Sequence, residues 1–406
     1  MKRYWKIFIG HMNKPFYFLS YTLVSAVLLG FSFSTDNSNV IDDNFVKTKG
    51  SSFVLNGEKI VFRGAGQWHT AKWNENTYSN LADIGFNSVR LYIDTGNYPE
   101  SFVPGYEAID KNIEMARKHG MTVILNVHMS PGSSGISDRG FFMHQERQDL
   151  LVDFWRKTAE RYKDETIIAG FDIINEPTVR VANVTQVYDC NGIAYLSYFE
   201  DYRKIIQRIV DEIREVNKNH TIIVERLWID GGHFSFGIND QRDCWQNYDG
   251  KYNFPDINDP ANNYAYTFHC YEPNTWVHQR PRTAVYPSEA FARWNEIDPK
   301  TGNPWKMNKA YLDYAYSIPL DYIRNIKNVP AYIGEIGILT WNYDDNDDGT
   351  NRGGTQYVED LYDILLNKYN VSNSWHPFYI VEFHPNMNSN HEASFRKAFG
   401  TEKKPK

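Results

Sequence analysis

Cysteine is scarce in this 406-residue chain, which has only three, at positions 190, 244 and 270. Three cysteines exclude a disulfide-held scaffold, and their spacing fits no zinc site. Cys190 and Cys244 lie in polar, loop-like sequence and could form one disulfide. Cys270 lies within a strand pattern, so we expect a buried free thiol there.

An excess of positive charge is also missing. The chain has 43 Lys and Arg against 50 Asp and Glu, a net charge of −7. This balance argues against a surface that binds polyanions, so nucleic acid is not an expected partner. No glycine-rich phosphate loop follows any early strand pattern, which argues against an open, doubly wound nucleotide-binding sheet.

Long apolar runs are absent except near the N-terminus. Basic residues precede an apolar run from Phe16 to Phe33, and a polar stretch follows. This order is typical of a secretory signal. No A-x-A cleavage site is evident, and about 18 apolar residues is close to the minimum for a membrane span, so an uncleaved anchor is the alternative. We therefore predict an export signal or N-terminal membrane anchor over 1–35, a polar linker over 36–50, and a secreted or membrane-anchored protein.

Aromatic residues, in contrast, are abundant: they make up 16% of the chain, with 11 Trp, 28 Tyr and 24 Phe. A large aromatic core explains such a composition, and so does a cleft lined with flat rings that stack on sugars or bases. Both interpretations stay open from composition alone.

The rest of the chain alternates between strand and helix patterns. It opens with "SSFVLNGEKIVFRG", in which Asn56-Gly57 predicts a hairpin turn. Eight largely apolar strand segments follow, and amphipathic helices separate most of them. The segments are "KIVFRG", "FNSVRLYI", "MTVILNVH", "IIAGFDIINE", "TIIVERLW", "YAYTFHCY", "AYIGEIGI" and "SWHPFYIVEF". This α/β pattern predicts a single (β/α)8 TIM barrel over 51–400, with a short N-terminal β-hairpin and long βα loops.

Polar or titratable residues stand at the carboxyl ends of most of these strands, where the active sites of such barrels form. A single polar residue at a strand end commonly has no function beyond hydrogen bonds to its neighbours or to water. The repetition of such residues over consecutive strands favours a shared site. The candidates are Arg90, His128, Asn175, Glu176, His269, Tyr271, Glu335 and Trp375.

The two glutamates indicate the chemistry. Glu176 and Glu335 end the fourth and seventh predicted strands, and cleavage of a glycosidic bond needs two carboxyl groups with different proton affinities. We expect Arg90 to keep Glu335 ionised, and a drier setting to keep Glu176 protonated. Tyr271 is expected to donate a hydrogen bond to Glu335.

Five of these segments, taken in order, resemble the motifs of family 5 glycoside hydrolases, which are retaining enzymes of the cellulase type. The matching segments are "NSVRLYI", "VILNVHMSPG", "FDIINEP", "TFHCYEPNTWVHQ" and "YIGEIGI". The resemblance implies that Glu176 is the acid/base and Glu335 the nucleophile, with their carboxyl groups roughly 5 Å apart. It also implies that Asn175 binds the sugar 2-hydroxyl.

The same resemblance implies that the remaining candidates position the sugar or the nucleophile, with Trp375 as the platform under the sugar. It predicts a monomeric endo-β-glycanase that needs no cofactor and no metal, with a polysaccharide as its partner. β-1,4-Glucan is the leading substrate, and mannan, xyloglucan or another β-glycan is the alternative. A barrel that binds glycans without cleaving them is the competing hypothesis from another class.

Weaker patterns concern the loops. Four tryptophans follow strand ends and either stack on sugars further along the site or anchor loops: Trp68, Trp73, Trp276 and Trp341. Asp344, Asn346 and Asp348 mimic the start of a calcium loop, but the twelfth position is Thr355 rather than Glu. We therefore interpret 344–349 as a solvated acidic loop, with calcium binding as the less favoured alternative.

Overall fold

The computed structural model describes residues 44–66, 73–133, 141, 144–180, 193–230, 254–277, 284–292, 297–338, 352–376 and 389–402. Several predictions fall outside these residues: the export signal or anchor, the Cys190–Cys244 pair, the acidic loop 344–349, Trp68 and Trp341. Among the helices of the described part, none is both long enough and apolar enough to cross a membrane.

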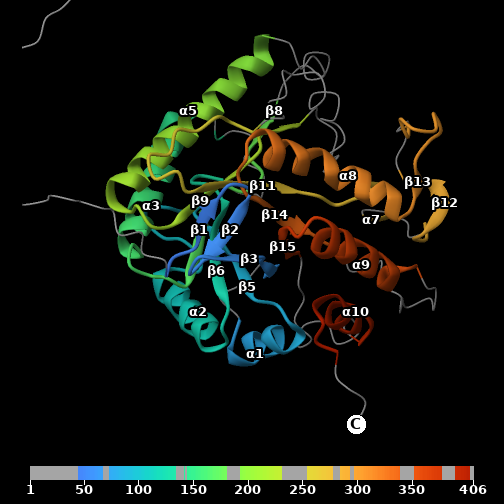
Figure 1. The fold of residues 1–406 in the computed structure, drawn as a ribbon. Helices are drawn as coiled ribbons and strands as arrows, with labels where there is room; N and C mark the ends of the chain where they lie inside the picture. The colour runs from blue at the N-terminus through green and yellow to red at the C-terminus, as the bar shows by residue number, and fades with distance from the viewer. Residues whose placement is uncertain are drawn as a thin grey trace, which may run out of the picture. The chain divides into compact units, whose positions relative to one another are not determined.

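A closed barrel of eight parallel strands forms the centre of the fold (Figure 1). In order around the barrel the strands are β4 (Arg63–Gly66), β5 (Ser88–Asp94), β6 (Thr122–Met129), β7 (Ile168–Asp172), β9 (Thr221–Glu225), β11 (Tyr264–His269), β14 (Ala331–Ile336) and β15 (Ser372–Trp375), which pairs back to β4. This confirms the predicted (β/α)8 barrel. The last strand begins two residues earlier than the predicted segment and ends at Trp375.

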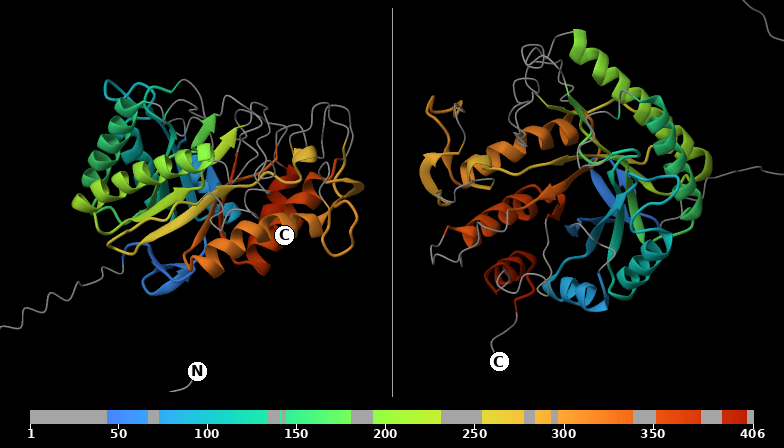
Figure 2. Two further views of the ribbon diagram at one scale, coloured as in Figure 1. Left: turned by 90° about the horizontal axis from the view of Figure 1, so that it is seen from above. Right: turned by 180° about the vertical axis from the view of Figure 1, so that it is seen from behind.

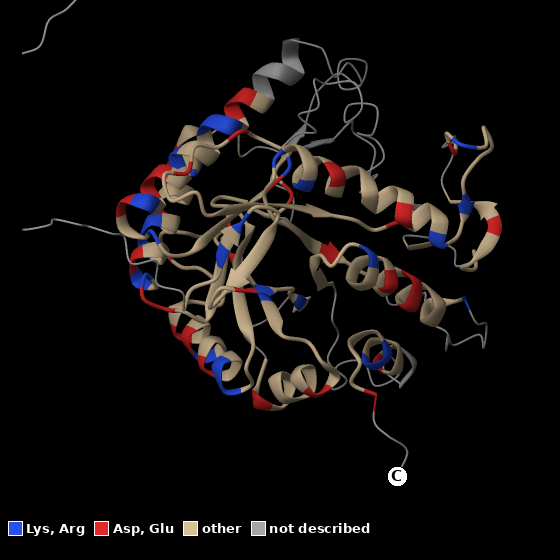
Figure 3. Ribbon diagram, viewed as in Figure 1, with Lys and Arg blue, Asp and Glu red and all other residues tan. Residues whose placement is uncertain are grey.

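Helices surround the barrel on its outside, as the two views in Figure 2 show. They are α1 (Glu75–Ile84), α2 (Tyr106–Lys118), α3 (Gln145–Arg161), α5 (Ile193–Val216), α7 (Asn274–Val277), α8 (Lys309–Asp321), α9 (Gly354–Tyr362) and α10 (Ser389–Phe399). Helices α8 and α9 continue as the π-helical turns η4 (Tyr322–Ile326) and η5 (Asp363–Lys368). The helices α2, α3 and α5 each bury one apolar face, as expected of the amphipathic segments between the strands. Lys, Arg, Asp and Glu lie interspersed on the outer helices (Figure 3).

A small ribbon precedes the barrel. Strands β2 (Ser52–Leu55) and β3 (Glu58–Ile60) pair antiparallel around Asn56 and Gly57, whose φ angles of 52° and 80° are those of the predicted hairpin turn. Strand β1 (Lys47–Lys49) adds a third strand within the stretch expected as linker, so the folded part begins before residue 51. Phe53 of the ribbon packs with Phe62, Ile124 and Tyr332 in a separate apolar cluster.

Two further strand pairs, which we did not predict, occur in the loops that follow barrel strands. Strand β8 (Thr178–Arg180) pairs in parallel with β10 (Trp228–Asp230), and β12 (Ser288–Phe291) pairs antiparallel with β13 (Lys306–Met307). The second pair lies in the connection between β11 and α8, which confirms one of the expected long βα loops. Cys270, just past β11, is a buried free thiol as predicted.

A buried ion pair joins α5 to the segment before β11. The Arg214 guanidinium donates two hydrogen bonds to the Asp259 carboxylate, from Nε at 2.7 Å and from Nη2 at 2.9 Å. It also donates to the carbonyl oxygens of Asn217, His220 and Asn263. We expect Arg214→Ala to lower the free energy of unfolding by about 3–5 kcal/mol, because it leaves a buried carboxylate without its partner.

Urea denaturation measures this loss. Arg156 is the control, because its pair with Glu212 is about half exposed on both sides. Arg156→Ala is expected to change the stability by no more than about 0.5 kcal/mol. Equal losses in the two variants would contradict the role given to the buried pair.

Candidate active site

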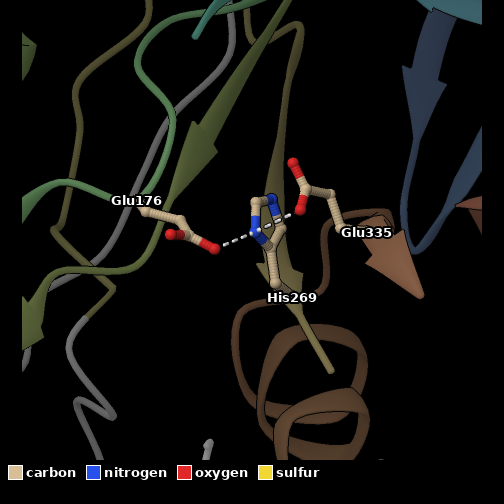
Figure 4. Close-up of side chains that lie close together, drawn as sticks. All are labelled: Glu176, His269 and Glu335. Atoms are coloured by element: carbon tan, nitrogen blue, oxygen red, sulfur yellow. Dashed lines mark hydrogen bonds and ion pairs between the residues drawn. The ribbon is translucent and has the colours of Figure 1, made fainter. Parts of the chain in front are cut away.

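The predicted residues meet at the carboxyl ends of the barrel strands, with the exception of Trp375. Arg90 comes from β5 and His128 from β6, Asn175 and Glu176 follow β7, His269 ends β11 and Tyr271 follows it, and Glu335 lies in β14. In Figure 4 the side chains of Glu176 and Glu335 approach the His269 ring from opposite sides. We call these residues the rim cluster: Arg90, His128, Asn175, Glu176, His269, Tyr271 and Glu335.

Arg90 organises one half of the rim cluster. Its fully buried guanidinium donates from Nη1 to Glu335 Oε1 at 2.8 Å, from Nη2 to Asn175 Oδ1 at 3.0 Å and from Nε to Asp172 Oδ2 at 2.8 Å. Among the residues that the structure describes, the amide Nδ2 of Asn175 has no hydrogen-bond partner. Arg90 therefore orients the amide so that this buried donor remains available to a ligand.

Glu335 is held as a carboxylate. Tyr271 donates its hydroxyl to Glu335 Oε2 at 2.7 Å, and Arg90 holds the other oxygen. Burial by itself raises the pKa of the Glu335 carboxyl, but electrostatic interactions with His269, His376, Arg90 and His128 outweigh it and hold the pKa well below its usual range. Both contacts predicted for Glu335 are present, and this group is ionised at neutral pH.

Glu176 lies on a strained backbone. Its φ of 43° is in the left-handed region that residues other than glycine rarely adopt, and such outliers concentrate at functional sites. The side-chain Oε1 accepts a hydrogen bond from His269 Nδ1 at 2.8 Å, and the main-chain N–H donates to Glu225 Oε2 at 2.8 Å. Both the backbone and the carboxyl group of Glu176 are therefore fixed by neighbouring strands.

His269 lies between the two glutamates. Its Nδ1 is 3.5 Å from Glu335 Oε2 as well as 2.8 Å from Glu176 Oε1. Burial lowers the pKa of the imidazole, but the charges of Glu225 and Glu335 and the hydrogen bond to Glu176 outweigh it and raise the pKa to about 9. Gly334 leaves room for this ring, since a Cβ there would lie 3.0 Å from His269 Nε2. His269 is thus a cation between two acids at neutral pH.

The expected difference in dryness between the glutamates is not found. Glu176 is 8% exposed and Glu335 is 4% exposed, so Glu176 is not the drier of the two. The two glutamates differ in their contacts instead, because the Arg90 guanidinium and the Tyr271 hydroxyl both bond to Glu335. The drier setting that we expected around Glu176 is therefore wrong.

A metal ion has one conceivable position among the described residues. Single ligand atoms of Glu176, His269 and Glu335 lie within 4.8 Å of one another. Metal binding requires a neutral imidazole, whereas His269 holds its proton up to about pH 9. A metal ion at this position would therefore compete with the proton that the neighbouring acids hold on His269.

Trp375 requires a correction. Its side chain is 2% exposed and packs in the helix layer, with its ring centroid 5.0 Å from that of Phe395 and 6.2 Å from that of Tyr362. A ring covered in this way has no face for a sugar. The next residue, His376, is the one that reaches the site, where its Nδ1 lies 2.6 Å from the Tyr92 hydroxyl.

Two other tryptophans anchor loops. Trp73 is 4% exposed and packs edge-on against Tyr78. Trp276 is fully buried between Tyr286 and Tyr357, and its Nε1 donates to the carbonyl oxygen of Arg352 at 3.1 Å. Neither ring offers an open face, so the loop-anchoring alternative holds for both.

The structure adds residues that we did not predict. Tyr92 stacks on His128 with ring centroids 4.1 Å apart, and Asn126 Oδ1 lies 3.1 Å from His128 Nδ1. Asp172 accepts a hydrogen bond from Arg90 Nε, and Glu225, the last residue of the fifth barrel strand, accepts one from the Glu176 main chain. The end of that strand reads "TIIVER", so a charged strand end was the available signal for Glu225.

Comparison with known proteins agrees with this geometry. The family model described as Cellulase (glycosyl hydrolase family 5) matches residues 46–376. Cellodextrinase A of Ruminococcus flavefaciens is 26% identical over 277 residues, which cover 65% of this chain and 68% of that protein. An endoglucanase of Paenibacillus polymyxa is 26% identical over 314 residues, covering 70% of this chain and 74% of that protein.

Among solved structures, the endoglucanase Cel5A of Thermotoga maritima superposes with a TM-score of 0.54 at 19% identity, covering 83% of this chain and 96% of that one. The β-glucanase SdGluc5_26A of Saccharophagus degradans gives a TM-score of 0.54 at 17% identity, covering 88% and 94%. At these identities the structural likeness supports the fold alone.

Proposed function

Because the chain belongs to glycosyl hydrolase family 5 and is a glycoside hydrolase of the cellulase type, we propose that it is a secreted, retaining endo-β-glucanase. Glu335 is the nucleophile of the proposed double displacement and Glu176 is the acid/base. The leading substrate is a β-1,4-glucan. Another β-glycan, such as mannan or xyloglucan, is the alternative within the same chemistry.

One observation carries the retaining mechanism. Carboxylate oxygens of Glu176 and Glu335 lie within 4.8 Å of each other. Retaining enzymes place their two carboxyl groups about 5–5.5 Å apart, whereas inverting enzymes leave roughly 6.5–9.5 Å for a water molecule. The short separation supports direct attack by one carboxylate on the sugar.

The residues of the rim cluster have distinct tasks in this mechanism. Glu335, whose two oxygens are bonded to Arg90 and Tyr271, attacks the anomeric carbon. Glu176 protonates the leaving oxygen and then removes a proton from the attacking water. The Nδ2 of Asn175, which has no partner in the described part of the chain, would donate to the sugar 2-hydroxyl, a contact that gains strength in the transition state.

The names of the relatives support glucan as the substrate. Two of the curated relatives are a cellodextrinase and an endoglucanase, both about one quarter identical to this chain. Secretion is proposed from the basic and apolar N-terminal sequence.

A panel of purified polysaccharides tests the proposal. The protein is incubated with carboxymethylcellulose, glucomannan, xyloglucan, xylan and mannan, and the reducing ends released are measured. We expect the fastest release from carboxymethylcellulose, and NMR is expected to show the β-anomer first. Release of no reducing ends from any polymer would refute the proposed activity. An α-anomer as the first product would refute retention.

The pH dependence follows from the charge on His269. Its raised pKa means that the ring is protonated below about pH 9 and loses its proton as the pH rises through that value. Loss of this cation removes the charge that stabilises ionised Glu335 and changes the hydrogen bond to Glu176. We expect kcat/KM on carboxymethylcellulose to fall about tenfold per pH unit above pH 9, in addition to any earlier loss.

Initial rates measured in overlapping buffers give this profile. Each sample is returned to neutral pH afterwards to confirm that activity recovers, which separates titration from unfolding. Full activity at pH 10 would contradict a required His269 cation.

A further inference from the structure

Glu225 is a buried acid beside the rim cluster to which the mechanism above assigns no task. It is the last residue of β9 and is fully buried. Its Oε2 accepts the main-chain N–H of Glu176 at 2.8 Å and lies 3.5 Å from His269 Nε2. The opposite nitrogen of that ring, Nδ1, is the one bonded to Glu176 Oε1. The Glu225 carboxyl group therefore bonds directly to the Glu176 backbone, and it is linked to the Glu176 side chain through the His269 ring.

The hydrogen bond from the Glu176 N–H to Glu225 is made at a residue with a strained backbone conformation. A glutamate with φ of 43° persists only when its surroundings over-determine the conformation. The N–H bonded to Glu225 belongs to this strained residue. Glu225 is itself held from the outer layer, since the Tyr202 hydroxyl of α5 donates to its carbonyl oxygen.

We propose that Glu225 is a positioning residue that aims the Glu176 carboxyl group at the leaving oxygen, through the Glu176 N–H and through His269. This inference rests on the proposed function, in which Glu176 is the acid/base. Glu225 acts through its neighbours and does not touch the sugar.

The charges around Glu225 agree with this role. Burial first, and then the charges of Glu176 and Asp172, raise the pKa of Glu225 to about 7 against the opposing effect of His269. With the pKa of His269 near 9, the two groups form an ion pair between about pH 7 and pH 9. The other titratable and charged groups that act on the pair are Asp172, Glu176, Tyr202, Glu335, His128 and His376, together with Arg90, which is bonded to both Asp172 and Glu335.

Leaving-group dependence tests the positioning of an acid. Phenyl β-cellobioside releases a basic phenolate that needs protonation, whereas 2,4-dinitrophenyl β-cellobioside releases an anion that does not. In Glu225→Gln we expect kcat/KM to fall about 10- to 100-fold on the phenyl substrate and less than about threefold on the dinitrophenyl substrate. A loss of equal size on both substrates would overturn the proposal.

A second readout needs no catalysis. Histidine side chains are labelled with ¹⁵N, and the His269 resonance is titrated in the intact protein. Removing the Glu225 charge is expected to lower the pKa of His269 by about one to three pH units. An unchanged His269 titration would overturn the link through the imidazole. If the wild type cleaves no glucan or cellobioside, the proposed function fails, and this titration still decides whether Glu225 controls His269.

Two further variants complete the test. Glu225→Asp keeps the charge but is too short to reach the Glu176 N–H, so we expect His269 to stay protonated while the phenyl substrate still loses rate. This variant carries the test if Glu225→Gln does not fold. Glu272→Gln is the matched control, because Glu272 is equally buried and bonds to Tyr311 of α8. A loss confined to the phenyl substrate in this control would also overturn the proposal.

Discussion

Replacing Glu335 with glutamine is expected to lower kcat on carboxymethylcellulose by at least about 10⁴-fold, or about 5.5 kcal/mol of transition-state stabilisation. The amide is nearly isosteric but cannot form the glycosyl ester. Arg90 and Tyr271, which now bond to the carboxylate, would face a neutral group. The loss is therefore chemical and should leave substrate binding largely intact.

The measurement is the rate of reducing-end release, with the dissociation constant for cellotetraose obtained by calorimetry. Glu272→Gln is the control, since it makes the same buried exchange of carboxyl for amide outside the rim cluster. A Glu335→Gln enzyme with wild-type activity would rule out Glu335 as the nucleophile.

Replacing Glu176 with alanine is expected to reduce kcat/KM on carboxymethylcellulose by about 10²- to 10⁴-fold, the usual contribution of a general acid. Unlike the loss of Glu335, this loss is expected to depend on the substrate. A dinitrophenolate leaves without protonation, so a dinitrophenyl glycoside should still form the intermediate on Glu335.

Azide provides the decisive observation for Glu176. The small anion needs no base, and it can enter the space that the side chain vacates. In Glu176→Ala with the dinitrophenyl substrate, added azide should raise kcat and give a β-glycosyl azide. The same addition should not restore activity to Glu335→Gln. Rescue of the Glu335 variant and not of the Glu176 variant would reverse the two assignments.

Much of the site was predictable because a strand end has a defined place in a barrel. Glu176 follows a strand, His269 ends one, and His128 and Glu335 lie one residue before a strand end, whereas Arg90 lies within β5; parallel strands of one barrel bring their carboxyl ends to one rim. Strand order along the chain is thus enough to bring these residues together.

The face of a strand on which a given side chain lies was less predictable. Successive side chains of a strand point to opposite faces, so a shift of one residue exchanges the inside and the outside. The predicted segment "SWHPFYIVEF" left that register open, and aromatic character favoured Trp375 as the residue in the site. In the fold Trp375 packs against Phe395 of α10, and His376 faces Tyr92 instead.

The sequence by itself determined the eight-strand barrel, the hairpin before it and the pair of glutamates at its rim, since period, turn residues and strand ends are local properties. Only the tertiary structure decided how the two acids differ. The pKa of Glu335 depends on groups distant along the chain, such as His269 and Arg90, and the orientation of Glu176 depends on Glu225, which bonds to its backbone. Electrostatic interactions depend on distances in space, and folding alone sets those distances.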